Sequence, residues 1–391
     1  MDISIFFEPI ELKGYEYAEK TRRKHLGDLV KAYIQPNSFP DYQGADLAIL
    51  GVSEDRHAIG NKGCAQAPDA IRKELYKLYQ GNFKLKMVDL GNLTRGNSID
   101  DTHFALTATL EELLRNNVTP IILGGGQDLT FSQYRAYEKI GKIVNIAVAD
   151  PMFDLGHSEQ ALDSRSYMSR IILQQPNYLF NYANIGYQSY FIDQDALRLM
   201  KNLFFDTYRL GIVHESLEEV EPIVRNADML TFDISAVRFS DAPGNANATP
   251  NGFYGEEACQ IVRYAGLSDK LTSIGFYEVN PRYDKSGQTA HLVAQMIWYF
   301  MDGFYNRAHD FPFKNEEDYL KYRVSIRDHK EEIVFYKSKK TDRWWMEIPL
   351  PAEQRIKYER HYLVPCSYKD YQVACENDIP DRWWMVYQKL M

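Results

Sequence analysis

The sequence predicts an α/β protein built around a mostly parallel β-sheet, and three observations lead to this prediction. From about residue 46 to residue 304, short apolar runs alternate with amphipathic stretches of helical length. Several runs, such as 119–123 and 143–149, are too continuously apolar for strands with one exposed face, which is typical of strands that are covered on both faces. Segments rich in glycine or aspartate follow three of the runs, at the strand ends where ligands bind in parallel sheets. We therefore expect three layers, with helices on both sides of the sheet.

The apolar patterns along the chain predict the individual strands and helices. The expected strands are residues 45–52, 85–91, 119–123, 143–149, 184–187, 210–213, 229–234 and 271–276. A helix is expected over residues 100–117, because its apolar residues recur with a helical period. The apolar stretch 292–300 contains Gln295 and is too short for a membrane span, so we expect a buried helix there.

The segments on either side of this region differ from it in composition. Residues 1–45 are predicted to be a polar N-terminal arm with a helix around residues 15–33, and residues 46–310 form the main domain. The C-terminal extension, residues 311–391, contains fifteen aromatic residues and no glycine. Within it, the runs 332–336 and 344–348 predict a β-hairpin.

The same extension carries the sequence Asp-Arg-Trp-Trp-Met twice, at residues 342–346 and 381–385. Four exposed tryptophans would form a larger apolar patch than monomers normally tolerate. We therefore expect the extension to pack on the main domain or at a subunit interface, with its tryptophans at least partly buried. A protein partner or a second copy of the chain is expected to bind there.

Composition and charge exclude several classes of function. The net charge of −9 and the pI near 5.6 argue against a nucleic-acid partner. No apolar run reaches the ~18 to 20 residues of a membrane span, and the first residues lack the basic start of a signal peptide. The four cysteines are scattered, which suits a reducing compartment. We expect a cytoplasmic protein without a membrane partner.

Three polar loops contain the candidate site. Their sequences are Gly-Gly-Gly-Gln-Asp-Leu-Thr at 124–130, Asp-Pro-Met-Phe-Asp at 150–154 and Thr-Phe-Asp-Ile-Ser at 231–235. Because each loop follows an apolar run, we expect Asp150, Asp154 and Asp233 to converge at one edge of the sheet. Carboxylates that lie close together repel one another. A cation, a proton on one carboxylate or an arginine must compensate, and we expect Arg238, in the same loop as Asp233, or another basic side chain to do so.

These loops resemble the metal-binding loops of the arginase, agmatinase and formimidoylglutamase family, the ureohydrolases. In that family the patterns G-G-D-H-S, D-A-H-x-D and S-x-D-x-D hold two manganese ions. Five other segments match the family in the same order along the chain: 60–72, 89–92, 185–191, 242–252 and 278–290. Of these, segment 185–191 is most similar to the formimidoylglutamase branch. The resemblance implies the arginase-like three-layer fold over residues 46–304. The chain from residue 311 onward has no counterpart in this pattern.

Residue by residue, the resemblance implies a degenerate metal site. Asp150, Asp154 and Asp233 match aspartates that bind metal in the family. Glu278 matches the glutamate that orients the guanidino or formimino group of the substrate. The remaining positions have changed: Gln127 and Met152 replace histidines, Ser235 replaces an aspartate, and Arg238 stands where a further aspartate is usual.

These replacements argue against two manganese ions. Manganese prefers carboxylate and imidazole ligands, and the thioether of Met152 is a poor substitute. We therefore expect no cofactor, and the alternative is one Mg²⁺, Ca²⁺ or Mn²⁺ held by Asp150, Asp154 and Asp233. The metals generate the attacking hydroxide in the family, so without them these aspartates and Glu278 would form a vestigial pocket.

Three functions remain open at this point. The favoured one is a ureohydrolase-fold protein that is an inactive homologue of the family's C–N hydrolases and acts in binding or assembly. The second is a formimidoylglutamase-like amidine hydrolase with an altered or single-metal site. The third is ligand sensing in the former substrate pocket. Metal analysis together with an assay of formimidoylglutamate hydrolysis distinguishes these functions.

Overall fold

The computed structural model describes residues 1–11, 25–156, 161–312, 316–327 and 332–390. Its centre is a ten-stranded sheet in the order β1-β4-β3-β5-β10-β9-β6-β7-β8, with β2 paired to β4 beside this path. The strands are, in that order, Phe7–Glu8, Met87–Leu93, Leu47–Val52, Thr119–Leu123, Ser273–Tyr277, Met229–Asp233, Val144–Ala149, Leu179–Tyr187 and Asp206–Arg209, with β2 at Lys31–Ala32. All pairs are parallel except β1 with β4. The predicted mostly parallel α/β fold is confirmed.

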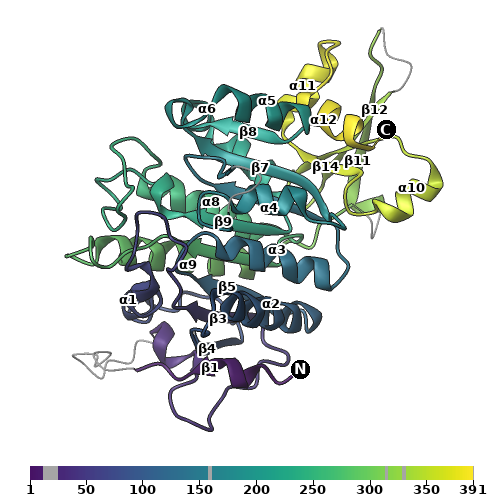
Figure 1. The fold of residues 1–391 in the computed structure, drawn as a ribbon. Coiled ribbons are helices and arrows are strands. Elements are labelled where there is room, and N and C mark those ends of the chain that lie inside the picture. The colour runs from purple at the N-terminus through teal and green to yellow at the C-terminus, as the bar shows by residue number, and fades with distance from the viewer. Residues whose placement is uncertain (12–24, 157–160, 313–315, 328–331, 391) are drawn as a thin grey trace.

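Helices cover both faces of this sheet (Figure 1). One layer contains α1 (Ala67–Leu75), α7 (Val220–Arg225), α8 (Gly255–Leu267) and α9 (Gln288–Tyr305), and the other contains α2 (Ile99–Arg115), α3 (Leu129–Lys139) and α4 (Tyr167–Leu173). Along β5, Ile121 and Leu123 belong to the core under the first layer, whereas Ile122 belongs to a core under the second. The strands therefore bury both faces, which explains why their sequences are continuously apolar.

The order of the elements differs from the prediction near residue 210. Residues 210–213 were expected to be a strand, but they belong to α6 (Leu210–Glu215), which follows β8 at the edge of the sheet and comes after α5 (Gln194–Asn202). The residues of β8 are partly exposed, so the strand lacks the apolar signature of the central strands. Leu210 and Val213 are buried at helical spacing.

The N-terminal arm also departs from the prediction. Of the helix expected around residues 15–33, residues 15–24 lie outside the described residues. Residues 25–33 are not an α-helix, because they contain the 3₁₀ turn η2 (Leu26–Asp28) and then β2. Hydrogen bonding of β2 to β4 at the sheet edge decides this local structure, which the local sequence pattern does not reveal.

The C-terminal extension forms a second, antiparallel sheet in the order β11-β12-β13-β14. Its strands are Tyr319–Val324, Ile333–Ser338, Trp344–Glu347 and Leu363–Cys366, and its helices are α10 (Ala352–Lys357), α11 (Tyr368–Cys375) and α12 (Asp381–Leu390). The predicted hairpin is present as β12 and β13. Trp344, Trp345 and Trp383 are buried, whereas Trp384 is 43% exposed. Across the described segments, no helix combines the length and the apolar composition that crossing a membrane requires.

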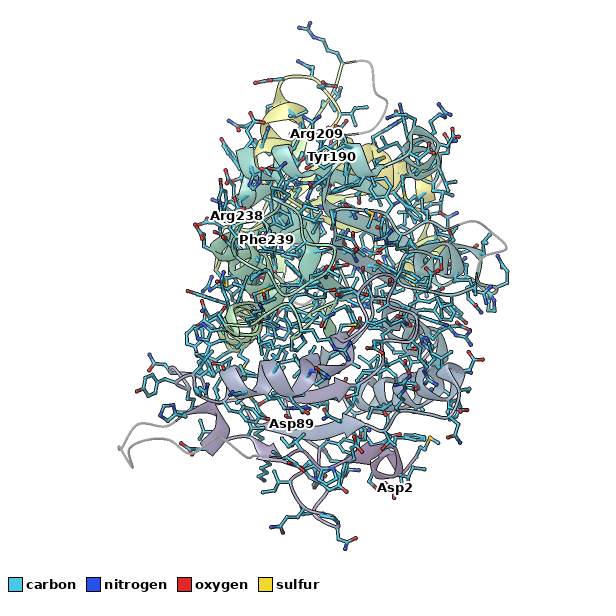
Figure 2. All side chains as sticks on the ribbon, turned by 60° about the vertical axis from the view of Figure 1, so that its left-hand side comes forward. Asp2, Asp89, Tyr190, Arg209, Arg238 and Phe239 are labelled. Atoms are coloured by element: carbon cyan, nitrogen blue, oxygen red, sulfur yellow. The ribbon has the colours of Figure 1, made fainter. Side chains whose placement is uncertain are left out.

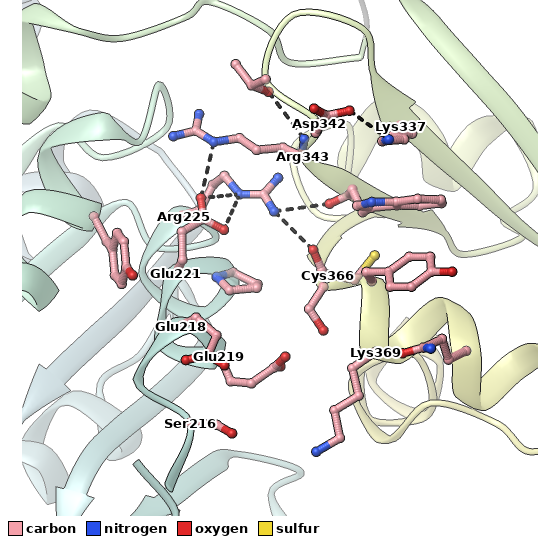
Figure 3. Close-up of a pocket in the computed structure, with 17 residues that line it drawn as sticks. Ser216, Glu218, Glu219, Glu221, Arg225, Lys337, Asp342, Arg343, Cys366 and Lys369 are labelled. Atoms are coloured by element: carbon pink, nitrogen blue, oxygen red, sulfur yellow. Dashed lines mark hydrogen bonds and ion pairs between the residues drawn. The ribbon is translucent and has the colours of Figure 1, made fainter. Parts of the chain in front are cut away.

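Arg225, at the end of α7, attaches this extension to the main sheet domain (Figure 3). Its Nη2 donates hydrogen bonds to the backbone oxygens of Trp344 at 3.1 Å and Cys366 at 3.2 Å. Its guanidinium carbon lies 4.4 Å from the centre of the Trp345 ring, and its Nε lies 2.9 Å from the Glu221 carboxylate. One buried cation therefore ties α7 of the main domain to the second sheet.

Candidate functional site

Four adjacent parallel strands bring the candidate residues together. In the order β5-β10-β9-β6, these strands lead to Gln127, Glu278, Asp233 and Asp150 at their carboxyl ends. Each strand is buried throughout, so its register is fixed by packing on both faces. Side chains that are up to 151 residues apart in the chain thereby meet at one edge of the sheet.

Asp150, Asp154, Asp233 and Glu278 are all buried, with exposed fractions of 8% or less. Burial raises the pKa of Asp150 to about 6 and that of Glu278 to about 7. Burial also raises the pKa values of Asp154 and Asp233 well above the ordinary range, and the negative charge of Asp150 raises them further. The four carboxyl groups thus form one electrostatically coupled cluster.

Hydrogen bonds fix the orientation of this four-carboxylate pocket. The Nδ2 group of Asn61 donates to Glu278 Oε2 at 2.7 Å, and the backbone N–H of Gln127 donates to Glu278 Oε1 at 2.9 Å. Asp150 Oδ1 accepts from the backbone N–H two residues later at 2.6 Å, and Asp233 Oδ1 does the same at 2.7 Å. One oxygen of each of these two aspartates therefore holds its loop, and Asp150 Oδ2 is buried without a hydrogen-bond partner.

Two residues of the pocket have a left-handed backbone. The φ angle is +50° at Asp154 and +65° at Glu278. Such a conformation costs a non-glycine residue on the order of 1 to 3 kcal/mol, and it is concentrated at functional sites. At Glu278 the hydrogen bonds from Asn61 and Gln127 hold the carboxylate that this conformation turns into the pocket.

The replaced positions lie in the same pocket. Gln127 donates from Nε2 to the Tyr167 hydroxyl at 3.2 Å, while its Oε1 is buried without a hydrogen-bond partner. Ser235 is buried and its hydroxyl bonds to Asp233, which favours the charged form of that carboxyl and so lowers its pKa. Met152 lines a cavity of about 170 Å³ next to Asp154. Small polar groups and a thioether therefore occupy the positions of the family's ligands.

Arg238 does not neutralise the carboxylates, so this prediction is wrong. Its Nε lies 2.8 Å from Asp241 Oδ1, its guanidinium carbon lies 3.9 Å from the centre of the Tyr254 ring, and it stands beside Phe239 at the outer edge of the molecule (Figure 2). Asp241 is three residues further along the same loop, so a local ion pair outcompetes a buried one. Among the described residues, none of the ion pairs involves the four carboxylates of the pocket.

The pocket offers oxygen donors for a hard cation. Asp150 Oδ2 and Asp154 Oδ2 are buried without hydrogen-bond partners, and so is Gln127 Oε1. Carboxylate and amide oxygens are the ligands that Mg²⁺ and Ca²⁺ take. A second ion would have to replace two imidazoles with a glutamine amide and a thioether, which is unfavourable for manganese. The donor set therefore fits one hard cation and does not fit a manganese pair.

Sequence patterns did not reveal some residues of the site. Asn61 lies in the glycine-rich segment 60–72, but nothing local shows that it contacts Glu278. Tyr167 and Arg165 belong to no motif, yet the first contacts Gln127 and the second lines the cavity next to Asp154. The positive charge of Arg165 lowers the pKa of Asp150, although burial has the larger and opposite effect.

Comparison with known proteins agrees with this architecture. The sequence model of the Arginase family matches residues 45–302. Formimidoylglutamase of Staphylococcus aureus (strain JH9) is 26% identical over 280 residues, which are 68% of this chain and 88% of that protein.

Two solved structures share the fold. The formimidoylglutamase of Bacillus subtilis subsp. subtilis str. 168 has a TM-score of 0.68 at 19% identity, covering 76% of this chain and 97% of that chain. Trypanosoma cruzi formiminoglutamase, solved with Mn²⁺₂, has a TM-score of 0.64 at 19% identity, covering 73% of this chain and 99% of that chain. With the family model matched from β3 to α9 and the motif loops at the ends of adjacent strands, the chain belongs to the arginase family.

Proposed function

We propose that this protein binds a small cationic amidine in the four-carboxylate pocket and does not hydrolyse it by a two-manganese mechanism. The observation that carries this proposal is the burial of Asp150, Asp154, Asp233 and Glu278 in one cluster that has no ion pair among the described residues. A bound cation relieves the repulsion among these groups. An amidinium suits the cluster because its N–H groups form charge-assisted hydrogen bonds with carboxylates.

The cavity beside the carboxylates supports a ligand with a charge at each end. Its wall contains Asp154 and Arg165, and also the apolar side chains of Phe153, Leu155 and Phe191. A ligand whose amidinium faces Asp154 can place a carboxylate against Arg165. Formimidoylglutamate has these two groups, and the relatives named above are formimidoylglutamases.

The chemistry of the replaced ligands supports binding without turnover. Hydrolysis of an amidine in this family depends on a metal-bound hydroxide, because bound metal lowers the pKa of water toward 7. Gln127 and Ser235 make hydrogen bonds within the pocket instead of offering imidazole or carboxylate ligands. The amidine carbon then has no activated nucleophile next to it.

A second candidate is amidine hydrolysis that depends on one divalent cation. The free Oδ2 atoms of Asp150 and Asp154 and the free Oε1 of Gln127 favour it, because these oxygens could hold one Mg²⁺, Ca²⁺ or Mn²⁺. The retained Glu278 would orient the amidine, as the family resemblance implies.

Calorimetric titration with formimidoylglutamate, together with an assay of formamide and ammonia release, separates the two candidates. We expect saturable binding in metal-free protein and no product release in the presence of Mn²⁺ or Mg²⁺. Asp233→Asn should weaken binding at least about tenfold, because each 1.4 kcal/mol of lost charge interaction is a factor of ten. Multiple turnovers with one added cation would establish the second candidate and overturn the first.

The matched control is Asp241→Asn, which removes a carboxylate that pairs with Arg238 outside the pocket. This variant should bind formimidoylglutamate like the unaltered protein. If neither binding nor turnover is detected in the unaltered protein, both candidates are wrong.

A further inference from the structure

A second group of potential ligands lies next to the carboxylate pocket but outside it. His57 follows β3, His103 lies in α2, and Asp128 immediately precedes α3. His103 Nε2 is 3.2 Å from Asp128 Oδ2 and His57 Nδ1 is 3.9 Å from the same oxygen. One ligand atom from each of the three residues lies within 4.8 Å of the other two. None of the three occupies a position that matches a metal ligand of the family.

Asp128 is turned toward the histidines rather than toward its own helix. It is the N-cap residue of α3, where an aspartate usually accepts a hydrogen bond from the first turn, but its side chain makes no such bond. Both carboxylate oxygens are fully buried and have no hydrogen-bond partner. A buried carboxylate that makes no capping hydrogen bond requires a nearby cation or a proton to neutralise its charge.

One tautomer of His103 leaves the Nε2 lone pair free to bind an ion. Its Nδ1 is 2.6 Å from Ser132 Oγ, and the Ser132 hydroxyl donates its own proton to the His103 backbone oxygen at 3.3 Å. When Nδ1 donates its proton to Ser132 Oγ, the lone pair of the neutral ring lies on Nε2. In this tautomer the lone pair faces Asp128 Oδ2 at 3.2 Å, and an ion bound between the two atoms removes their mutual repulsion.

We propose that His57, His103 and Asp128 form a mononuclear site for a divalent transition-metal ion of the Zn²⁺ class. Imidazole and carboxylate are ligands that zinc commonly takes, and a metal-bound histidine usually donates its other ring N–H to a neighbouring group. Ser132 Oγ, 2.6 Å from His103 Nδ1, is placed to accept that proton. With bond lengths of about 2.0 to 2.2 Å, tetrahedral ligand atoms lie about 3.3 to 3.6 Å apart. The 3.2 Å separation of His103 Nε2 and Asp128 Oδ2 is close to this range, whereas His57 Nδ1 must approach from 3.9 Å and lies within 4.8 Å of the other two ligand atoms.

The site is accessible to solvent at one side only. The side chain of His57 is 28% exposed, that of His103 is 10% exposed, and that of Asp128 is 1% exposed. An ion can enter past His57, and water completes its coordination there. Because the three ligands come from separate elements, the ion would join the loop after β3 to α2 and α3. The proposal does not depend on the amidine pocket.

Zinc content and affinity test the site in the full-length protein. After treatment with a chelator, titration with Zn²⁺ against a chromophoric competitor should give about one ion per chain and a rise in melting temperature. Asp128→Asn and His103→Gln should abolish stoichiometric binding, and Ser132→Ala should weaken the affinity about tenfold, as the loss of a supporting hydrogen bond does. His214→Ala, a half-buried histidine that pairs with Glu257, should keep one ion.

Circular dichroism of the metal-free variants checks that they fold, and Asp128→Asn keeps the shape of the side chain it replaces. A Co²⁺-substituted protein should show visible absorption typical of low coordination, which Asp128→Asn should lose. The proposal is overturned if no Zn²⁺ binds below about 100 μM, which corresponds to about −5.5 kcal/mol. It is also overturned if Asp128→Asn binds Zn²⁺ normally while Asp233→Asn does not.

Discussion

Asn61 and Glu278 are 217 residues apart in the chain, and a 2.7 Å hydrogen bond joins the Asn61 Nδ2 group to the Glu278 carboxylate. The same amide group also donates to the backbone oxygen of Glu278 at 2.9 Å, and its Oδ1 accepts from the backbone N–H of Ala246 at 3.0 Å. Three loops at the edge of the sheet therefore meet at one buried amide.

Asn61→Ala is expected to destabilise the protein by about 2 to 3 kcal/mol, because buried hydrogen-bonding groups lose their partners. Ligand binding in the four-carboxylate pocket should weaken at the same time, since Glu278 would lose its support. Urea unfolding measures the stability. The control is Asn202→Ala at the exposed end of α5, which should stay within about 0.5 kcal/mol. Equal stability of the two variants would contradict the structural role of Asn61.

The stability of the metal-free protein should depend on pH through Asp150. Its folded-state pKa of about 6 lies above the ordinary value of about 3.9. Between these values the folded state binds more protons than the unfolded state, so the free energy of unfolding falls as pH rises from about 4 to above 6. The loss reaches at most about 3 kcal/mol, at 1.36 kcal/mol per pKa unit.

Asp150→Asn removes this titration. The variant should therefore be about 1 to 3 kcal/mol more stable than the unaltered protein at pH 8 and should lose that advantage near pH 4. Denaturant unfolding across the pH range, with a chelator present, is the measurement. If the free energy of unfolding of the two proteins depended on pH in the same way, burial would not raise the pKa of Asp150.

Restoring the family's ligands should restore its metal pair. The triple variant Gln127→His, Met152→His and Ser235→Asp puts imidazole and carboxylate groups where the family has them. We expect its manganese content to rise to about two ions per chain, and formimidoylglutamate hydrolysis to appear with it. Elemental analysis and product release measure both effects. Adding Asp233→Asn to the triple variant should abolish both effects. A triple variant that binds no manganese pair would contradict the idea that the three replaced ligands alone account for the missing metal site.

Arg225→Ala should loosen the C-terminal extension. The substitution removes two hydrogen bonds to backbone oxygens, the contact with Trp345 and the partner of Glu221. Breaking a buried ion pair costs about 3 to 5 kcal/mol. Thermal unfolding and proteolysis of the extension test this expectation. Arg198→Ala, in an exposed pair on α5, should change stability by less than about 1 kcal/mol.

The sequence by itself determined the sheet and the place of the site. Continuously apolar strand sequences indicate that both faces of the sheet are buried. Polar loops that follow parallel strands lie at the same edge of the sheet. Asp150, Asp154 and Asp233 could therefore be grouped before the fold was known, and the family resemblance added Glu278. Two expectations about secondary structure failed, at residues 210–213 and in the N-terminal arm, where position at the edge of the sheet and pairing with a distant strand decide the structure.

Only the tertiary structure decided where individual side chains point. Arg238 turns to Asp241 instead of the carboxylates, Asn61 reaches Glu278, and His57 and His103 meet Asp128 although no spacing connects them. Apolar periodicity encodes how deeply a residue is buried, because burial follows from the local repeat of a helix or strand. The direction of a polar side chain depends on partners brought close by long-range packing, which a local pattern does not contain.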